Sequence, residues 1–511
     1  MYSFRHSDEF PRFVFAFIIL LSCLYISRPV IAIPAFEGAE GFGANTSHAR
    51  GTGVCVVDNL EDTDQVQEAK QLVQGSFRYC LGRAKESGGS YIIFAISGTI
   101  NLKRPAFIPS NTYIAGQTSP GGIALEGAAI VIENAENVVV RHLRHREAAN
   151  KGDAFTVSNA HNIVIDHVSV SFFKDGAVDI VDGSSDVTIQ WSHMGDAIFS
   201  GFKDERYHGQ PNLLRTDVNR ISLHHNFYTH GHTRMPLVSH NVAYPGFLIE
   251  FSNNVIYNYG KYPSRFAAYE GLGNVIGNYY VPGRNTHSDS SVSPIGAKGK
   301  NVLLHKSLGA GARPPILVEN GMRLFLHDNF MEDGDGHDGS NFTDKYGKQI
   351  DFGRPGHVTG VRKDQSQPEG RMVASAAGKI VEKVVPFVPL EHRVAAVPQI
   401  KTDPAKTNMR SVLQSFGALP RDNTDNRLVK EFQSRWGRWK YIKPFDENRY
   451  TVGLIIDSDF DGMSDDFEKR AGGDIGPIGH DLNENLDNIE IYLDELAHAL
   501  LESNPAIALK N

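Results

Sequence analysis

The sequence has few cysteines, no excess of basic residues and only one long apolar run. Each of these features argues against a class of protein. Its 51 Lys and Arg face 59 Asp and Glu, and the resulting net charge of −8 argues against a general nucleic-acid-binding surface. The one long apolar run, from Phe13 to about Ile26, is too short to cross a membrane comfortably. Arg5 and Arg12 precede this run and a small-residue cleavage site ends at Ala32, so we predict that residues 1–32 are a secretory signal peptide. A retained membrane anchor is the alternative.

Removal of this leader would leave two of the three cysteines, Cys55 and Cys80, in an extracellular or periplasmic protein. In an oxidising compartment these two can pair and staple an N-terminal cap. Two free buried thiols are the alternative. The two cysteines flank a charged stretch, residues 58–73, which we predict to be the capping helix.

Between Asn137 and Asn278 one pattern recurs, a short β-branched run followed by a polar break and a turn. The runs begin 25, 24, 34, 26 and 28 residues apart, at Val138, Ile163, Val187, Ile221, Phe247 and Val275. A period in this range marks a solenoid, in which each repeat buries its apolar face by stacking on its neighbours. Because each run is about as long as a strand, we predict an all-β solenoid over residues 33–330, with buried strands also at 91–100 and 113–116.

Four asparagines stand near the ends of successive rungs, each before an apolar or aromatic residue: Asn226, Asn254, Asn278 and Asn329. Asparagine tolerates the left-handed backbone and can hydrogen-bond its own turn. We therefore predict an internal asparagine ladder at one corner of the coil, with a structural role.

The repeat stops after residue 330. Residues 331–450 are predicted to be a loop-rich flanking segment with helices near 408–416 and 425–436, and residues 451–511 a separate α-helical module. Within that module the twelve residues from Asp457 to Glu468 fit the EF-hand calcium-loop template, with Gly462 at position 6. The predicted metal ligands are Asp457, Asp459, Asp461, Asp465 and Glu468. A role in stability or docking is expected, and an acidic turn that binds nothing is the alternative.

Three aspartates on adjacent repeats, Asp153, Asp175 and Asp179, form a second acidic group. On a regular strand, positions four apart point to one face about 13 Å from each other, and a bend at Gly176 would bring Asp175 and Asp179 closer. Carboxylates that converge repel each other unless a cation lies among them, and Ca²⁺ prefers such oxygen ligands. The alternative is three unrelated surface aspartates.

The segment from His224 to Leu237, HHNFYTHGHTRMPL, resembles the arginine motif of the pectate lyases, which are secreted right-handed parallel β-helix enzymes of polysaccharide lyase family 1. The residues Ile165-Asp166-His167 resemble the strand-ending Asp-His step of that family, and the likeness covers roughly residues 35–283. The resemblance implies that Arg234 is the catalytic residue. It also implies that Asp153, Asp175 and Asp179 bind Ca²⁺.

The chain departs from the family pattern at several positions. Lys151 stands where an acidic residue is common, no lysine stands near Ile198 or Phe199, and Ser239 replaces a second groove arginine. Three basic residues are candidate substitutes for binding the substrate: Lys203, Lys261 and Arg265. These departures leave the reaction plausible and place the identity of the substrate in doubt.

The implied chemistry is β-elimination on an acidic polysaccharide, pectate first, to give a 4,5-unsaturated uronate. Bound Ca²⁺ would neutralise the substrate carboxylate and acidify the proton at C5. Because arginine ordinarily stays protonated, Arg234 would act either as a base whose pKa is lowered by nearby cations, or as a stabiliser of the enolate while hydroxide takes the proton. Both versions predict activity that rises toward alkaline pH.

Three other functions are compatible with the sequence. They are a lyase for a different uronan, a non-catalytic carbohydrate-binding β-helix, and a hydrolase with paired carboxylates. His230 and His232 have no third ligand at suitable spacing, so zinc is disfavoured. Asp166 and His167 are expected to form a structural pair, and one of His224 and His225 to be packed at a corner. A monomer is expected.

Overall fold

The computed structural model describes residues 33–63, 72–148, 152–199, 208–240, 246–260, 263–268, 271–283, 285–286, 316–319, 322–331, 390–435, 437–439 and 456–507, with short strands between 342 and 386. The chain divides into two units, Met1–Ile33 and Pro34–Asn511. The predicted signal peptide lies outside the described residues. Among the described helices, none combines the length and apolar character that a membrane span requires.

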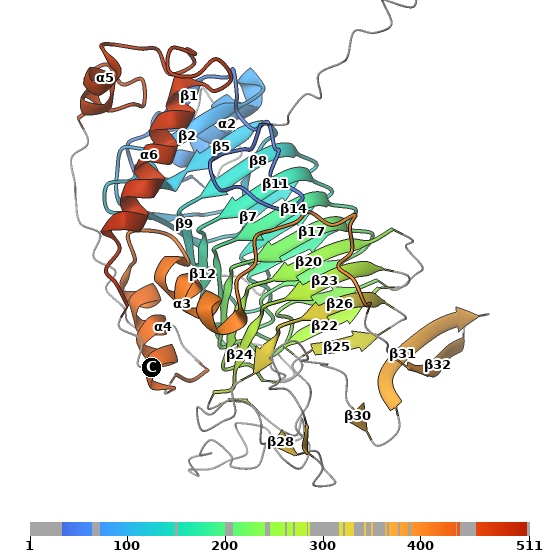
Figure 1. Cartoon of the computed structure of the whole chain (residues 1–511). Coiled ribbons are helices and arrows are strands. Elements are labelled where there is room, and N and C mark those ends of the chain that lie inside the picture. Colours follow the sequence, from blue (N-terminus) through green and yellow to red (C-terminus); the bar gives the residue numbers. More distant parts are fainter. Residues whose placement is uncertain are drawn as a thin grey trace, which may run out of the picture. The chain divides into compact units, whose positions relative to one another are not determined.

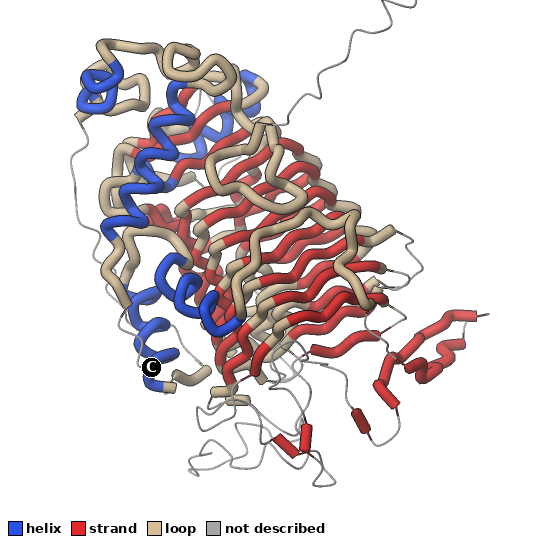
Figure 2. Tube along the Cα trace, viewed as in Figure 1, coloured by secondary structure: helices blue, strands red, loops and turns tan. Residues whose placement is uncertain are grey.

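The second unit contains three parallel sheets, and each sheet is built from strands that stack turn upon turn. Figure 2 shows these stacked strands in red. The ten-stranded sheet contains β1 (Val54–Val57), β2 (Ser90–Phe94), β5 (Thr112–Ala115), β8 (Glu136–Arg141), β11 (His161–Asp166), β14 (Ser185–Gln190), β17 (Asn219–His224), β20 (Leu248–Ser252), β23 (Leu272–Ile276) and β26 (Arg323–His327). The eight-stranded sheet contains β4 (Ala106–Phe107), β7 (Ile130–Glu133), β10 (Phe155–Ser158), β13 (Val178–Val181), β16 (Leu213–Arg215), β19 (Leu237–Ser239), β22 (Ser264–Ala267) and β25 (Ile316–Glu319). The nine-stranded sheet contains β3 (Gly98–Asn101), β6 (Ile123–Gly127), β9 (Leu143–Ala148), β12 (Ser169–Ser171), β15 (His193–Gly195), β18 (Phe227–Thr229), β21 (Val255–Tyr257), β24 (Tyr279–Val281) and β27 (Phe330–Met331).

The chain passes through the three sheets in turn, and each strand pairs in parallel with the strand one turn later (Figure 1). The predicted fold class, an all-β parallel β-helix, is confirmed. Outside the coil the structure has β28 (Phe342–Thr343), β29 (Gln349–Ile350), β30 (Lys363–Asp364), β31 (Gln367–Ala376), β32 (Lys379–Pro386), α2 (Phe77–Ser87), α3 (Ala405–Ser415), α4 (Asn423–Ser434), α5 (Asp465–Ala471), α6 (Asn488–Ser503) and the 3₁₀ turn η2 (Gly116–Thr118).

The repeated β-branched runs belong to the ten-stranded sheet. Val138, Ile163, Val187 and Ile221 stand in one register row across four adjacent strands, and all four side chains are fully buried. Phe247 falls just before β20, where Ile249 continues the row. Stacking of like side chains at one-strand spacing removes their apolar surface from water, which is why the period in the sequence specifies the coil.

The predicted asparagine ladder is confirmed. The side-chain amide of Asn226 donates to Asn254 Oδ1 at 3.1 Å, Asn254 donates to Asn278 at 2.9 Å, and Asn278 donates to Asn329 at 2.8 Å. All four side chains are buried. Each asparagine also satisfies backbone groups that the corner leaves outside the sheets, as buried polar groups require.

An aromatic ladder lines the same corner. His142, His167, Trp191 and His225 all have φ between 48° and 55°, and their rings stack in this order with centroids 4.9, 6.2 and 4.3 Å apart. His225 is the packed corner histidine that the sequence predicted, and His224 is buried as well.

The N-terminal cap differs in part from the prediction. Cys55 and Cys80 form a disulfide that ties β1 to α2, so the pairing is confirmed. The cap helix is α2, which begins after Ser76, whose side chain accepts from Tyr79 N–H at 3.1 Å. Residues 58–63 and 72–73 are not helical, and the middle of the predicted helix lies outside the described residues. The predicted strand at 91–100 is two strands, β2 and β3, separated by a turn.

The two flanking helices, α3 and α4, begin two to three residues before their predicted starts. Their apolar faces pack on the nine-stranded sheet, where Phe416 and Phe432 contact Phe227 at ring distances of 4.7 and 5.8 Å. Residues 334–367 lie outside the described residues except for parts of short strands. The predicted boundaries at 330 and 450 therefore stay predictions.

Candidate functional site

The three aspartates and Arg234 lie near the starts of strands β10, β13 and β19 of the eight-stranded sheet. Asp153 lies two residues before β10, Asp175 lies three before β13, and Asp179 is the second residue of β13. Arg234 lies three residues before β19, which is two strands beyond β13 in the sheet order. At about 4.8 Å per strand, this places its turn roughly 10 Å from β13.

Gly176 lies at the centre of the acidic group. Its N–H donates to Asp153 Oδ1 at 2.9 Å, and Leu213 N–H donates to Asp179 Oδ1 at 3.0 Å. A Cβ at position 176 would lie 2.5 Å from Asp153 Oδ1 and 2.7 Å from Asp179 Oδ1, so only glycine fits between these carboxylates. Asp175 stands in a bend and not on the strand, so the bend applies and the extended 13 Å geometry does not.

The four charges act on one another. Burial raises the pKa of Asp153, the negative charge of Asp175 raises it further, and Arg234 lowers it. Burial also raises the pKa of Asp179 well above its usual value, with Asp153 adding to the rise and Arg234 opposing it. Raised carboxyl pKa values at a partly exposed group of like charges mark a position that favours a cation.

The donor chemistry of this group fits calcium. One oxygen of each carboxylate is already held: Asp153 by Gly176 N–H, Asp179 by Leu213 N–H, and Asp175 by His208 Nδ1 at 3.2 Å. Among the described residues the second oxygen of each has no hydrogen-bond partner. The three carboxylates lie farther apart than a preformed metal group, in which one oxygen from each would lie within 4.8 Å of the others. Three hard oxygen donors suit Ca²⁺ and do not suit zinc.

The exposed face of the eight-stranded sheet continues away from this group. The strand register aligns Asp179, Leu213, Leu237 and Arg265 in one row. The next row on the same face contains Arg215 and Ser239. Arg215 and Arg265 are exposed. The sequence pointed to Arg265 but not to Arg215. Arg215 lies beside Ser239 because β16 pairs with β19 in this register, and turns of unequal length hide that register in the sequence.

Several residues that the sequence singled out are not seen in this site. Lys203 and Lys261, two of the predicted substrate-binding residues, and Lys151 lie outside the described residues. Ile198 and Phe199 are buried, and Phe199 stacks on Trp439 at 4.4 Å.

The histidines near Arg234 are engaged in structural contacts. His230 is fully buried between Asn258, whose amide lies 2.6 Å from its Nδ1, and Glu431, 2.8 Å from its Nε2. His232 packs edge-on against Trp439 with ring centroids 5.6 Å apart. Neither histidine belongs to a three-ligand group among the described residues.

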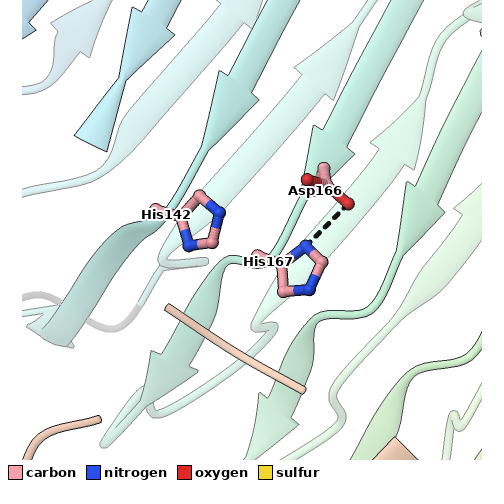
Figure 3. A group of neighbouring side chains, drawn as sticks. All are labelled: His142, Asp166 and His167. Atoms are coloured by element: carbon pink, nitrogen blue, oxygen red, sulfur yellow. Dashed lines mark ion pairs between the residues drawn. The ribbon is translucent and has the colours of Figure 1, made fainter. Parts of the chain in front are cut away.

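A buried group of His142, Asp166 and His167 does bring three ligand atoms together (Figure 3). Asp166 is satisfied, because its carboxylate accepts from Arg141 Nε at 2.8 Å and Gln190 Nε2 at 2.9 Å and lies 2.9 Å from His167 Nδ1. Burial opposes its ionisation, but His167 and Arg141 outweigh burial and hold the pKa of Asp166 well below its usual value. The two imidazoles stack face to face at 18° and do not converge on a common point. The group is structural, as expected for the Asp166–His167 pair.

The C-terminal acidic loop brings four of its five predicted ligands into two neighbouring groups. Asp457, Asp459 and Asp461 form one, and Asp459 and Glu468 form the other together with Asp474. Asp465 belongs to neither, because Ser458 N–H and Oγ hold its two oxygens at 2.7 and 2.6 Å. Asp474 lies beyond the twelve-residue template, so the motif could not reveal it.

Residues 14–267 match the family model described as pectate lyase. Curated relatives include a probable pectate lyase C from Emericella nidulans, 33% identical over 271 residues, which are 52% of this chain and 58% of the relative. Another, from Aspergillus flavus, is 34% identical over 274 residues, 52% of this chain and 59% of the relative. The chain thus spans less than two thirds of the curated relatives it matches.

Among solved structures, a pectate lyase from Bacillus sp. N165 in complex with trigalacturonate is similar over 75% of this chain and 99% of its own, with 13% identity and a TM-score of 0.43. A pectate lyase from Paenibacillus sp. 0602 is similar over 76% of this chain and 98% of its own, with 14% identity and a TM-score of 0.39. The matched region contains all four residues of the Asp153–Arg234 group. Through residues 14–267, just under half of its length, the chain is similar to the pectate lyase family.

Proposed function

We propose that this protein is a secreted, calcium-dependent pectate lyase that cleaves polygalacturonate, or a related uronate polymer, by β-elimination to 4,5-unsaturated products. One observation supports the proposal. Asp153, Asp175 and Asp179 lie on a partly exposed side of the coil, close enough to Arg234 for its charge to act on Asp153 and Asp179. These residues lie in the region that matches the pectate lyases.

Asp153, Asp175 and Asp179 would hold the calcium ion, since hydrogen bonds from Gly176, Leu213 and His208 engage one oxygen of each carboxylate. When bound there, the ion supplies positive charge that neutralises a uronate carboxylate and so acidifies the neighbouring C5 proton. A Cβ at position 176 would fill the space between the carboxylates, so Gly176 keeps the group open.

Arg234 supplies the second positive charge at the reacting uronate. Its backbone has φ 63°, and its carbonyl accepts from Asn212 N–H at 2.8 Å, which fixes the turn that presents the side chain to the acidic group. Charge that develops at the carboxylate during loss of the C5 proton is stabilised by a cation already held in place. The arginines on the exposed face, Arg215 and Arg265, bind uronate carboxylates farther along the polymer.

The C-terminal acidic loop is a second calcium site, which takes no part in the chemistry. The protein acts as a monomer outside the cell.

The test is to incubate the full chain with polygalacturonate and follow the ultraviolet absorbance of the unsaturated product, with added Ca²⁺ and then with chelator. We expect product only with Ca²⁺, and loss of turnover in Arg234→Lys with an unchanged circular dichroism spectrum. Arg220→Lys is the matched control, since Arg220 on β17 pairs with Asp186 on β14, in the ten-stranded sheet. Full cleavage by Arg234→Lys would remove Arg234 from catalysis. Binding of the polymer without cleavage would instead identify a carbohydrate-binding protein.

A further inference from the structure

The C-terminal segment holds an acidic cluster formed by Asp457, Asp459, Asp461, Glu468 and Asp474. Asp459 is common to two groups of three carboxylates, and the ligand oxygens within each group lie within 4.8 Å of one another. The loop backbone sets these positions: Phe460 and Gly462 have φ of 62° and 105°, and their N–H groups donate to the two oxygens of Asp457 at 2.8 and 3.0 Å.

Glu468 gives an independent indication of a ligand. Its side chain is only 7% exposed, and its Oε1 is buried with no hydrogen-bond partner. A carboxylate oxygen of Glu468 belongs to the group shared with Asp459 and Asp474. A buried carboxylate oxygen without a donor costs free energy unless a ligand satisfies it.

The ligand that this acidic cluster favours is a cation that prefers oxygen ligands. Among the described residues no basic side chain forms an ion pair with any of the five carboxylates, and the nearby Arg470 pairs with Glu495 instead. Five carboxylates without nitrogen or sulfur ligands match Ca²⁺, which takes six to eight oxygens.

The other side of the same loop is buried against the first strands of the coil. A Cβ at Gly462 would lie 2.9 Å from both Val54 on β1 and Ile93 on β2. Met463 and Phe467 are buried in a cluster with Tyr91, Ile93 and Tyr113 from the coil and with Ile489, Tyr492 and Leu493 from α6. Val54, Tyr91 and Tyr113 form one row across β1, β2 and β5, so this packing covers one face of the ten-stranded sheet at its first strands.

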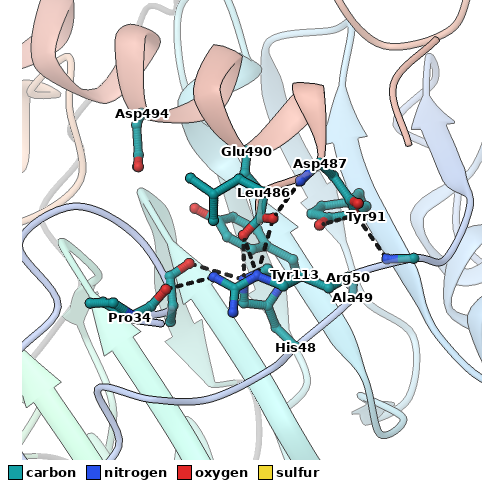
Figure 4. Close-up of polar contacts among 12 residues, drawn as sticks. Pro34, His48, Ala49, Arg50, Tyr91, Tyr113, Leu486, Asp487, Glu490 and Asp494 are labelled. Carbon is teal, nitrogen blue, oxygen red and sulfur yellow. Dashed lines mark hydrogen bonds and ion pairs between the residues drawn. The ribbon is translucent and has the colours of Figure 1, made fainter. Parts of the chain in front are cut away.

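Helix α6 continues the attachment with polar contacts (Figure 4). Asp487 accepts from Tyr91 Oη and from Gly51 N–H, both at 2.8 Å, and Glu490 accepts from Arg50 Nε at 2.8 Å. One turn later, Asp494 accepts from Arg141 Nη1 at 2.9 Å. The acidic loop is therefore joined to the coil both directly, through Met463 and Phe467, and through α6.

We propose that Asp457, Asp459, Asp461, Glu468 and Asp474 bind one Ca²⁺, and that this ion fastens the C-terminal segment over the first strands of the coil. The ion holds the loop in the shape that buries Met463 and Phe467. Loss of the ion frees residues 456–503 and uncovers β1. The proposal differs from the sequence template in its ligands, with Asp474 taking part and Asp465 not. It does not depend on lyase activity.

Calcium binding to the full chain, measured by isothermal titration after removal of metal, tests the ligand set. The variants are Asp459→Asn, which removes the shared ligand, Asp474→Asn, and the matched control Asp465→Asn, the same acid-to-amide change in the same loop. We expect one fewer ion, or at least about tenfold weaker binding at one site, in Asp459→Asn and Asp474→Asn, with Asp465→Asn like the wild type. Equal binding in Asp459→Asn and the wild type overturns the site. Loss of binding in Asp465→Asn with normal binding in Asp474→Asn overturns the ligand set.

Hydrogen–deuterium exchange with and without Ca²⁺ tests the fastening. We expect Ca²⁺ to slow exchange across residues 456–503 and in β1 in the wild type and in Asp465→Asn, and to have no such effect in Asp474→Asn. Asp474 is exposed, so its replacement leaves the core intact even where Asp459→Asn fails to fold. Calcium binding at the loop without slower exchange in β1 overturns the fastening. Neither measurement uses polysaccharide, so its outcome is independent of the proposed lyase activity.

Discussion

Arg141 on β8 and Asp166 on β11 form an ion pair across adjacent strands, with Arg141 Nε 2.8 Å from Asp166 Oδ2 and both side chains at least 95% buried. The same guanidinium reaches Asp494 on α6 at 2.9 Å, so this pair connects the coil to the C-terminal helix. Asp166→Asn removes one of the two carboxylates that neutralise this buried guanidinium and leaves only Asp494 paired with it. We expect Asp166→Asn to lower the free energy of unfolding by about 3 kcal/mol, measured by denaturant titration.

The control for this prediction is an ion pair of the same kind on the surface. Arg220 on β17 and Asp186 on β14 form such a pair, and 43% and 21% of their side chains are exposed. Solvent screens this pair, so Asp186→Asn should cost no more than about 1 kcal/mol. Equal losses in the two variants would show that burial does not set the strength of the Arg141–Asp166 pair.

The disulfide between Cys55 and Cys80 closes a loop with a sequence separation of 25. Cross-linking restricts the unfolded chain, so the double variant Cys55→Ser, Cys80→Ser should lose about 2–4 kcal/mol of stability. Thermal unfolding of the wild type with and without reductant measures the same effect. A melting temperature that reductant leaves unchanged would contradict a stabilising role for this bridge.

The sequence was most informative where one rule repeats along the chain. The β-branched row through Val138 and Ile163 and the ladder through Asn226 and Asn254 were both predictable, because stacked turns place equivalent residues on top of one another. The acidic group was predictable in part, since Gly176 marked the bend that joins its members.

What remained out of reach depends on register and on turns outside the repeat. Arg215 reaches the exposed face beside Ser239 only because β16 pairs with β19 in one particular register, after a turn longer than its neighbours. Asp474 joins the C-terminal cluster after two consecutive glycines, Gly472 and Gly473, with φ of 109° and 143°. Sequence spacing does not encode either path.

Buried neutral histidines make the coil sensitive to acid. Burial lowers the pKa of His224 to about 4 and lowers the pKa values of His142, His193 and His225 well below the usual value. The unfolded chain binds these protons near pH 6.5, so the stability that neutral histidine contributes is present above that pH and is lost as the pH falls toward 4. For His224 the loss by pH 4 is about 3 kcal/mol.

Denaturant titrations at pH 7, 5.5 and 4.5 measure this loss. A His224→Gln variant should show a shallower fall in stability between pH 6.5 and 4.5 than the wild type, whatever its stability at pH 7. A parallel fall in both proteins would show that His224 does not contribute to acid sensitivity.

The exposed arginines should separate substrate binding from turnover. Arg215 and Arg265 stand on adjacent exposed rows of the eight-stranded sheet, and Arg265 lies three strands from Asp179, about 14 Å at the usual strand spacing. At that distance they meet uronates beside the reacting one. Loss of such uniform binding raises KM and leaves kcat nearly unchanged, whereas Arg234→Lys lowers kcat.

We therefore expect Arg215→Ala and Arg265→Ala each to raise KM for polygalacturonate about tenfold, equivalent to about 1.4 kcal/mol. Arg83→Ala is the control, because Arg83 is 54% exposed on α2, within the N-terminal cap and far along the chain from both arginines. A shorter substrate such as a trimer should lose less affinity than the polymer in these variants, since it contacts fewer of the outer positions. If kcat falls instead while KM stays constant, the two arginines act on the reacting uronate itself, and the binding face must be sought on other strands of the coil.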